Sequence, residues 1–348
     1  MTEKVTRRDW LKTTGGAVAG LVVGAAGGYF AGSTTAQPPT LPKPEKKVAK
    51  VAFLFSGPID DLGWNAQHYA GLQYLASQGR ETHYTETVDP TQVEKVARDY
   101  IALGYNFIIY GGGWAREGFL ATAKAFPDTA HLLVEGTSED WGPNTETTLD
   151  QSQQTGYIEA VLAAKLTTSK VVGNVIGMEV PDINLWTSGI AAGLAATDPS
   201  IKRLYSVVGS FEDPAKGKEA TLGLIEAGAD VILECGDGTT FGIVEAVKAN
   251  NVKTMSQWGG TRDFAGSKDD KLLGELGVAE GYCDWSVAFA NSVARFEDGT
   301  FGHRGYEPSF QNGQLKVNLN PTYPEFQSLV DDLSTKIKNG QVAVPTSQ

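Results

Sequence analysis

The alternation of short apolar runs with amphipathic helical stretches constrains the fold of this chain more than any other feature. The runs form two sets of similar order, at residues 51–55, 107–110, 132–134, 171–176, 204–208 and 231–233. Unbroken apolar strands require a sheet that is covered on both faces, and strands separated by helices pair in parallel. The pattern therefore predicts an α/β protein with two doubly wound parallel-sheet lobes joined by a hinge.

The length of 348 residues exceeds the size at which a single hydrophobic core keeps growing, so two domains are expected. We expect residues 50–150 with about 257–285 to form lobe 1, and residues 151–256 with about 286–345 to form lobe 2. In open α/β sheets, ligands bind outside the carboxyl ends of the strands. The loops that follow the strands of both lobes should therefore face one cleft, which is a preferred place for a ligand.

The N-terminus has a different composition from the rest of the chain. Residues 6–12 read Thr-Arg-Arg-Asp-Trp-Leu-Lys, which resembles the twin-arginine export signal, and a Gly/Ala-rich apolar stretch follows at 15–32. We expect residues 1–36 to be this export signal or an N-terminal anchor, and the Pro/Lys-rich residues 37–49 to be a linker. A true membrane span is the weaker alternative, because the glycines make the stretch only mildly hydrophobic. The expected location is extracytoplasmic, either periplasmic or attached to the cell surface.

Composition and motifs exclude several classes of function. The formal net charge of −12, without a Lys/Arg cluster beyond the N-terminus, argues against a nucleic-acid partner. The sequence contains no GxGxxG, GxSxG, GxxxxGK[ST] or HExxH motif, so we expect no enzyme activity, no cofactor and no metal site. Cys235 and Cys283 have neither CxxC spacing nor histidine neighbours, and a disulfide between them is left open.

The strongest local signal for a ligand is the turn after the first strand, at residues 57–68, Gly-Pro-Ile-Asp-Asp-Leu-Gly-Trp-Asn-Ala-Gln-His. Aromatic side chains near other predicted strand ends add to it, since stacking on a flat ring contributes about 0.5–1.5 kcal/mol per pair. A core position for any one tryptophan, an N-cap role for Asp61 and a structural role for His68 are alternatives. The candidate ligand-binding residues are Asp60, Asp61, Trp64, Asn65, Gln67, His68, Trp114, Glu135, Trp186, Phe211, Asp237 and Trp258.

Blocks of sequence along the chain carry a family resemblance. They are the turn at 57–68, Ala-Phe-Pro-Asp at 125–128, the Gly-Ser-Phe-Glu-Asp-Pro-Ala-Lys-Gly-Lys-Glu-Ala segment at 209–220, and Ala-Gly-Ala-Asp-Val-Ile at 227–232. Together they resemble the basic membrane protein (BMP) family of ABC-transporter substrate-binding proteins. The resemblance implies a type I periplasmic-binding-protein fold, ABC permease and ATPase partners, and a purine nucleoside, a nucleobase or, in one branch, riboflavin as ligand.

The same resemblance implies roles for particular residues. Trp64 would stack on the base from one lobe and Phe211 from the other, with Asp60, Asp61 and Asn65 near enough for polar contacts. Where nucleoside-binding members carry an aspartate that contacts the ribose, this chain has Gln257-Trp258. A base without a sugar, or another flat ring, is therefore the expected ligand.

The resulting hypothesis is an exported receptor that captures a purine-like planar heterocycle between two lobes and delivers it to an ABC importer. The alternatives are a ligand sensor without transport, a riboflavin-binding protein, and an enzyme that acts on a nucleoside.

Overall fold

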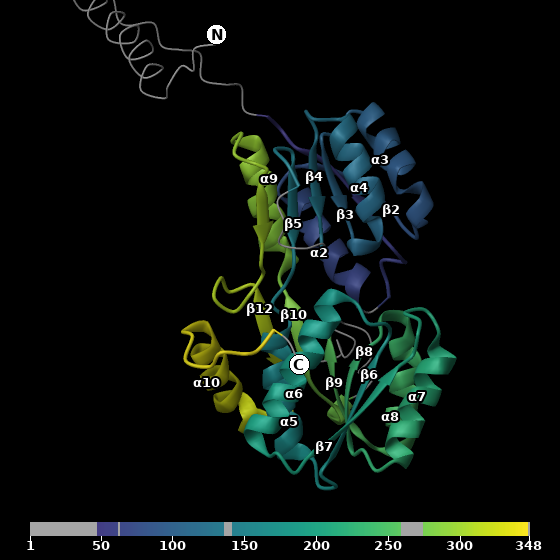
Figure 1. The fold of residues 1–348 in the computed structure, drawn as a ribbon, viewed down its shortest axis with the longest axis vertical. Helices are drawn as coiled ribbons and strands as arrows, with labels where there is room; N and C mark the ends of the chain where they lie inside the picture. Colours follow the sequence, from purple (N-terminus) through teal and green to yellow (C-terminus); the bar gives the residue numbers. More distant parts are fainter. Residues whose placement is uncertain (1–46, 62, 136–140, 259–273, 347–348) are drawn as a thin grey trace, which may run out of the picture. The chain divides into compact units, whose positions relative to one another are not determined.

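The computed structural model describes residues 47–61, 63–135, 141–258 and 274–346, all of which belong to one compact unit, Lys46–Gln348 (Figure 1). The expected export signal or anchor at 1–36, and nearly all of the linker at 37–49, lie outside the described residues. Within the described part of the chain, every helix is too short or too polar to span a bilayer.

The first sheet has the strand order β11-β5-β4-β3-β1-β2, and all of its strands are parallel. Alternate residues of its central strand point to opposite faces: Phe53 packs with helices α2 and α9, whereas Leu54 packs with α3 and α4. Its strands are β1 (Lys50–Leu54), β2 (Glu81–Thr85), β3 (Phe107–Tyr110), β4 (Ala130–Leu133), β5 (Thr145–Thr148) and β11 (Arg304–Tyr306). Its helices are α2 (Trp64–Ser77), α3 (Val93–Ala102), α4 (Arg116–Ala125) and α9 (Trp285–Glu297).

The second sheet has the order β12-β10-β9-β8-β6-β7, in which only β12 is antiparallel to its neighbour among the described strands. Its strands are β6 (Val171–Ile176), β7 (Lys202–Val207), β8 (Val231–Cys235), β9 (Lys253–Gln257), β10 (Gly277–Cys283) and β12 (Leu315–Leu319). Its helices are α5 (Gln153–Leu166), α6 (Pro181–Thr197), α7 (Pro214–Glu226), α8 (Thr240–Asn250) and α10 (Gln327–Lys338). Short 3₁₀ turns are η1 (Pro90–Gln92), η2 (Gly113–Ala115), η3 (Asp237–Thr239), η5 (Gly274–Leu276) and η6 (Pro324–Phe326).

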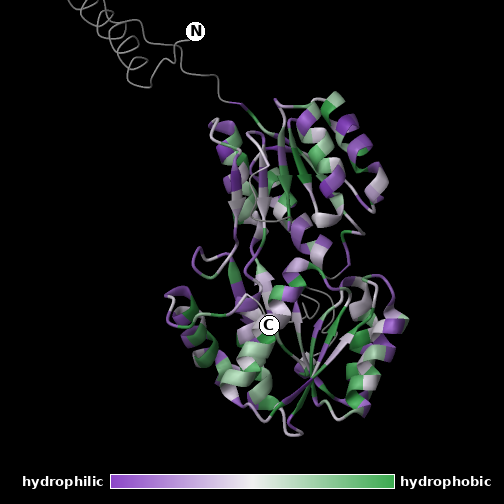
Figure 2. Ribbon diagram, in the orientation of Figure 1, coloured by the Kyte–Doolittle hydropathy of each residue, from purple (hydrophilic) through white to green (hydrophobic). Residues whose placement is uncertain are grey.

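The two sheets confirm the predicted class of two α/β lobes. Helices α5 and α6 pack together beside the second sheet, and α7 and α8 form a second pair. Hydrophobic residues run along the strands of both sheets, green in Figure 2, as a sheet covered on both faces requires.

The assignment of the C-terminal third to the lobes differs from the expectation. Residues 257–285 were expected in lobe 1, but β10 pairs with β9 and β12 and so belongs to the second sheet. Residues 286–345 were expected in lobe 2, where β12 and α10 do lie, but α9 packs on α2, and β11 pairs with β5 in the first sheet. The reason is aromatic packing: Phe289 and Phe296 on α9 lie 5.7 and 5.8 Å, ring to ring, from Phe53 and Phe107 of the first sheet.

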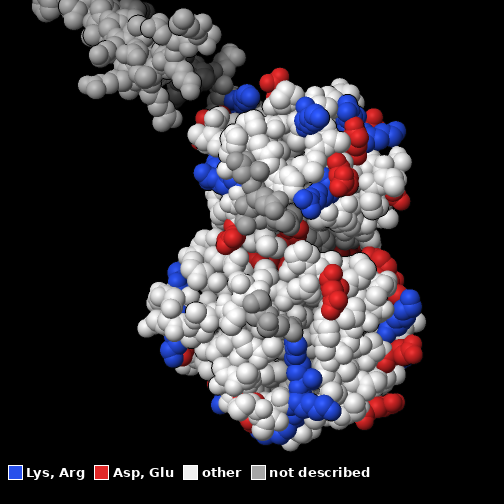
Figure 3. Space-filling view, viewed as in Figure 1, with Lys and Arg blue, Asp and Glu red and all other residues white. Residues whose placement is uncertain are grey.

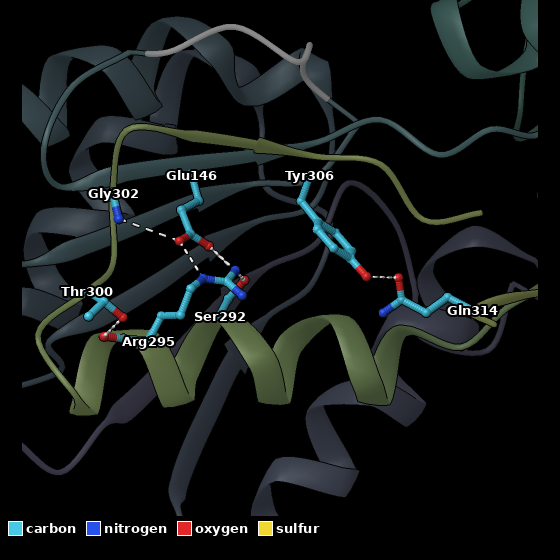
Figure 4. A network of polar contacts seen from close by, with 7 residues as sticks. All are labelled: Glu146, Ser292, Arg295, Thr300, Gly302, Tyr306 and Gln314. Atoms are coloured by element: carbon cyan, nitrogen blue, oxygen red, sulfur yellow. Dashed lines mark hydrogen bonds and ion pairs between the residues drawn. The ribbon is translucent and has the colours of Figure 1, made fainter. Parts of the chain in front are cut away.

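A polar network fixes α9 to the first lobe (Figure 4). Glu146 on β5 is fully buried and accepts hydrogen bonds from Ser292 Oγ at 2.9 Å and from Arg295 Nε at 2.8 Å, with Arg295 Nη2 also in contact. Both donors lie on α9, so a single carboxylate on β5, the strand next to the edge strand β11, holds this helix to the sheet. Nearby, the Tyr306 hydroxyl on β11 donates to the Gln314 side chain, where the chain leaves the first sheet for β12.

Candidate functional site

A cavity of about 440 Å³ lies where the carboxyl ends of strands from both sheets converge. Its aromatic walls are Trp64, Trp114, Trp141, Phe211 and Trp258. Its charged lining residues are Arg116, Glu135, Asp182 and Asp237. Because parallel strands of a doubly wound sheet end at the same edge, residues far apart in the sequence meet in one place.

Each wall of the cavity is built by a loop that follows a strand. In the first sheet, Trp64 follows β1, Trp114 follows β3 and Glu135 follows β4. In the second sheet, Asp182 follows β6, Phe211 follows β7, Asp237 follows β8 and Trp258 follows β9. The rule that ligands bind at strand ends therefore predicted where the side chains of this cavity come from.

Trp64 is half-buried in the cavity wall, and neighbouring groups fix the position of its ring. Its indole Nε1 donates to the Gly111 carbonyl at 2.8 Å. Its ring meets the Trp258 ring edge to face, with centroids 5.6 Å apart, and lies 4.1 Å from the His68 ring. A ring fixed in this way presents a pre-organised apolar wall, which lowers the entropic cost of binding a flat ligand.

Asp61 and Asn65 hold the turn together and lie outside the cavity lining. The Asp61 carboxylate accepts hydrogen bonds from the backbone N–H groups of Gly63, Asn65 and Ala66 at 2.9–3.0 Å, and from Asn65 Nδ2 at 2.8 Å. Asn65 Oδ1 in turn accepts from Ser56 Oγ at 3.1 Å. These contacts satisfy the orphan N–H groups of the first turn of α2, which is the capping role weighed for Asp61.

The other predicted residues of this turn also lie away from the cavity lining. Asp60 is exposed, and Gln67 is buried with no hydrogen-bond partner for its amide among the described residues. His68 is buried between Trp64 and Trp285, with its Nδ1 2.6 Å from the Trp64 carbonyl oxygen. Burial lowers the pKa of His68 to about 3, so this imidazole is neutral in the folded protein.

Trp186 lies on the buried face of α6, where α5 and α6 pack together. Its ring is fully buried, and Nε1 donates to Glu159 Oε2 at 2.6 Å. Of the predicted residues, the cavity lining thus includes Trp64, Trp114, Glu135, Phe211, Asp237 and Trp258, and it does not include Asp60, Asp61, Asn65, Gln67, His68 and Trp186.

Sequence reasoning did not single out Arg116, Trp141 or Asp182. The Arg116 guanidinium lies over the Trp141 ring, 4.6 Å from its centroid, so the two form one charged and aromatic corner of the cavity. Asp182 is in the first turn of α6, after β6. The available signals were an arginine two residues after Trp114 and an aspartate at the strand-end position of β6.

Several cavity residues have backbone conformations that non-glycine residues rarely adopt. Glu135, Asp237 and Trp258 have φ angles of 50°, 50° and 68°. Such left-handed conformations cost about 1–3 kcal/mol each and cluster at ligand sites. Their presence in strand-end loops of both sheets supports this cavity as the candidate functional site.

Carboxyl groups crowd one end of the cavity. The Asp150 backbone N–H lies 3.4 Å from both carboxylate oxygens of Glu135, and Asp150 itself is fully buried. Burial raises the pKa of Glu135 well above its usual range, and the nearby Asp150 and Asp182 charges raise it further. Burial also raises the pKa of Asp182, to about 6. These groups therefore hold protons at higher pH than exposed carboxyls do.

The lobes touch each other at the mouth of the cavity. Asp237 Oδ1, from the second lobe, accepts a hydrogen bond at 3.1 Å from the Trp64 N–H at the start of α2. Gly63 makes this contact possible, because a Cβ there would lie 2.4 Å from Asp237 Oδ1. Burial raises the pKa of Asp237, with the Asp61 charge adding to the effect and the hydrogen bond from Trp64 opposing it.

Comparisons with known proteins identify the family. A model of the Bmp family, described as ABC transporter substrate-binding protein PnrA-like, matches residues 48–265. The ABC transporter nucleoside-binding protein BmpA of Lactococcus lactis is 23% identical over 308 residues, covering 83% of this chain and 86% of that protein. A purine-binding protein of Brucella abortus is 22% identical over 298 residues, covering 84% of this chain and 82% of its own.

Solved structures share the fold. An ABC transporter solute-binding protein from Conexibacter woesei superposes with a TM-score of 0.70 at 24% identity, over 86% of this chain and 99% of that one. One from Aeropyrum pernix gives 0.71 at 18% identity, over 86% of this chain and 94% of its own. The resemblance predicted from the sequence blocks is confirmed: the chain belongs to the Bmp family of PnrA-like ABC transporter substrate-binding proteins.

Proposed function

We propose that this protein captures a purine-like planar heterocycle between its two lobes and hands it to the permease and ATPase subunits of an ABC importer. The observation that carries the proposal is the aromatic cavity itself. Trp64 and Trp114 line it from the first lobe, and Phe211 and Trp258 line it from the second. A flat ring inserted among such walls gains dispersion and quadrupole interactions beyond the burial of its area.

The polar groups of the cavity suit the edge of such a ring. The carboxyl groups of Glu135, Asp182 and Asp237 line the cavity, where they accept hydrogen bonds from ring or exocyclic N–H groups. Relatives that are named as nucleoside-binding and purine-binding proteins support a purine-like ligand. Asp61 and Asn65 then act indirectly, because they hold the first turn of α2 and with it the Trp64 ring.

A base without its sugar is the form of ligand that we propose. Trp258 lies in the cavity wall with only 2% of its surface exposed, at the end of β9, where the family resemblance placed a ribose-contacting aspartate. An indole offers a ribose hydroxyl little more than one N–H donor, whereas an aspartate offers acceptors for two hydroxyls. The Trp258 ring instead enlarges the apolar wall for a heterocycle.

Capture requires that the lobes open and close. We propose a hinge where the chain passes between the sheets, after β5, between β10 and α9, and between β11 and β12. The contact of Asp237 with the first turn of α2 belongs to the closed form. We further propose export by the twin-arginine route, with residues 1–36 as signal or membrane anchor and an extracytoplasmic site of action.

A thermal-shift screen of the full-length chain tests the proposed ligand class. The panel contains adenine, guanine, hypoxanthine and xanthine, the matching nucleosides, riboflavin, sugars and amino acids. A ligand that binds only the folded state stabilises it by about 2.7 kcal/mol at a concentration of one hundred times Kd. The proposal predicts the largest rise in melting temperature with a nucleobase.

The matched variants are Trp64→Ala and Trp186→Phe. Trp64→Ala removes a cavity wall and should abolish the ligand-induced shift, whereas Trp186→Phe changes a tryptophan outside the cavity and should keep it. A shift with sugars or amino acids alone, or a nucleobase shift that survives Trp64→Ala, would contradict the proposal.

A further inference from the structure

The charges that line the cavity are unbalanced. Glu135, Asp182 and Asp237 contribute carboxyl groups, and Arg116 is the basic residue among the described residues of the lining. The Arg116 guanidinium already lies over the Trp141 ring. On the face shown in Figure 3, acidic side chains gather where the two lobes meet, while basic side chains lie mostly nearer the far ends of the lobes. The cavity lining therefore contains more acidic than basic groups.

A second, independent feature of the cavity favours the same kind of ligand. Its walls are indole and phenyl rings, whose faces carry partial negative charge. A cation placed over such a face gains about 0.5–2 kcal/mol, most when it is desolvated, and several rings around one cation form the aromatic cage that recognises organic ammonium groups. Neutral ligands gain the stacking but not this charge-dependent part.

We propose that the ligand is bound as a cation, that is, as a planar nitrogen heterocycle carrying a fixed positive charge or a proton taken up on binding. This inference rests on the proposed function and specifies the chemical class of ligand for the same cavity. Aromatic faces of Trp64 and Trp258 contact the charged ring. The carboxylates of Glu135, Asp182 and Asp237 supply the countercharge.

Acidic groups behind the cavity lining also favour a positively charged ligand. Asp150 lies against Glu135 with both carboxylate oxygens buried, and its pKa is raised by burial and by the Asp182 charge. Cys283 also lies near Glu135, and burial raises its pKa, so it is a neutral thiol. Among the described residues, the charges that raise the pKa of Glu135 come from Asp150 and Asp182.

The surroundings of Asp237 have the same character. Its acidic neighbours are Asp61, Asp182 and Glu212, and the buried Cys235 thiol lies nearby. The stabilising partner is the Trp64 N–H at the start of α2. Burial and nearby acidic charges raise the pKa of Glu135 and Asp237, and burial raises that of Asp182, whereas a bound cation stabilises the ionised forms of all three. Binding of a fixed cation should therefore release protons and tighten as pH rises through the pKa of Asp182, about 6.

The test compares two isomers of one purine by isothermal titration with the full-length chain at pH 7. 1,9-Dimethyladenine is a cation at this pH, and N6,9-dimethyladenine is its neutral isomer, so the two differ in charge at nearly equal size. The inference predicts that the cation binds with a Kd about tenfold lower or better, the preference that one desolvated cation–π contact supplies. Repeating the titration in buffers of different ionisation enthalpy should show proton release for the cation.

Variants assign the preference to the cavity. Glu135→Gln should remove most of the preference for the cation and reduce proton release. Asp182→Asn serves the same purpose if Glu135→Gln does not fold. The matched control is Glu234→Gln, because Glu234 is also a buried carboxyl but bonds to Thr240 outside the cavity lining, so the preference should be kept.

The possible outcomes separate this inference from the proposed function. Equal or tighter binding of the neutral isomer would overturn the cation inference and leave the purine-like ligand in place. Binding of neither isomer, with a sugar or an amino acid bound instead, would overturn both. A cation preference that persists in both Glu135→Gln and Asp182→Asn would also overturn the inference, because the countercharge would then lie elsewhere.

Discussion

Gly63→Ala tests whether the contact between the lobes is part of the bound state. A Cβ at residue 63 would lie 2.4 Å from Asp237 Oδ1, 3.2 Å from Asp237 Cα and 3.3 Å from Asp237 Cγ. Carbon–oxygen contacts below about 3 Å are repulsive. To relieve this overlap, the first turn of α2 and Asp237 would have to move apart by several tenths of an ångström. Overpacking of this kind costs typically about 1–3 kcal/mol.

In the proposed hinge motion the overlap is present only in the closed form, so we expect the cost to appear in ligand affinity. A penalty of 1–3 kcal/mol corresponds to a Kd that is higher by roughly tenfold to a hundredfold. Isothermal titration with the best ligand from the screen measures the change, and chemical denaturation without ligand checks that the fold is kept.

The matched control is Gly223→Ala in α7, where an added Cβ would meet no atom within 4 Å. This control should leave Kd unchanged and stabilise the helix by up to about 1 kcal/mol. An unchanged Kd in Gly63→Ala would refute the reasoning, since the ligand-bound form would then not contain the contact between Gly63 and Asp237.

Further substitutions test the surrounding structure. Glu146→Ala leaves Arg295, whose side chain is 16% exposed, without its carboxylate, and urea denaturation should show a loss of about 3–5 kcal/mol; a loss below about 1 kcal/mol would contradict this. Burial raises the pKa of Glu234 to about 8 from the usual 4.5, so the wild type loses stability as pH rises between these values. Glu234→Gln should therefore raise the melting temperature at pH 8.5 but not at pH 4.5, and an equal effect at both would refute the assignment. Trp186→Phe removes the hydrogen bond to Glu159 and should lower stability by about 1–3 kcal/mol in denaturation experiments, without changing ligand Kd.

Local patterns predicted strands β1, β3, β4, β6, β7 and β8, but not β2, β5 or β10 to β12, and not how the chain passes between the two sheets. The apolar run at residues 51–55 is the buried β1, and the loops after β1, β3 and β4 carry the side chains expected there. The lobe assignment of β10 and α9 was wrong, because hydrophobic periodicity does not determine which sheet a strand or helix joins. The position of α9 on the first sheet is set by long-range contacts, such as the ring of Phe289 against Phe53, and by the buried carboxylate of Glu146.

The candidate site shows the same division between local and long-range information. Trp64, Trp114 and Phe211 lie in or at the end of loops that follow strands, so the rule that ligands bind at strand ends was enough to predict them at the cavity. His68 is one helical turn after Trp64 and points into the packing against α9, which periodicity alone does not reveal. Trp141 precedes β5 rather than following a strand, so its place over Arg116 depends on the folded loop.

A crystal structure of the chain with the nucleobase that gives the largest thermal shift tests the central claim most directly. The account predicts the ring inside the 440 Å³ cavity, stacked on Trp64 and Phe211, with its N–H edge toward Glu135 or Asp237. A base bound outside this cavity, or inside it but away from both aromatic rings, would contradict the account.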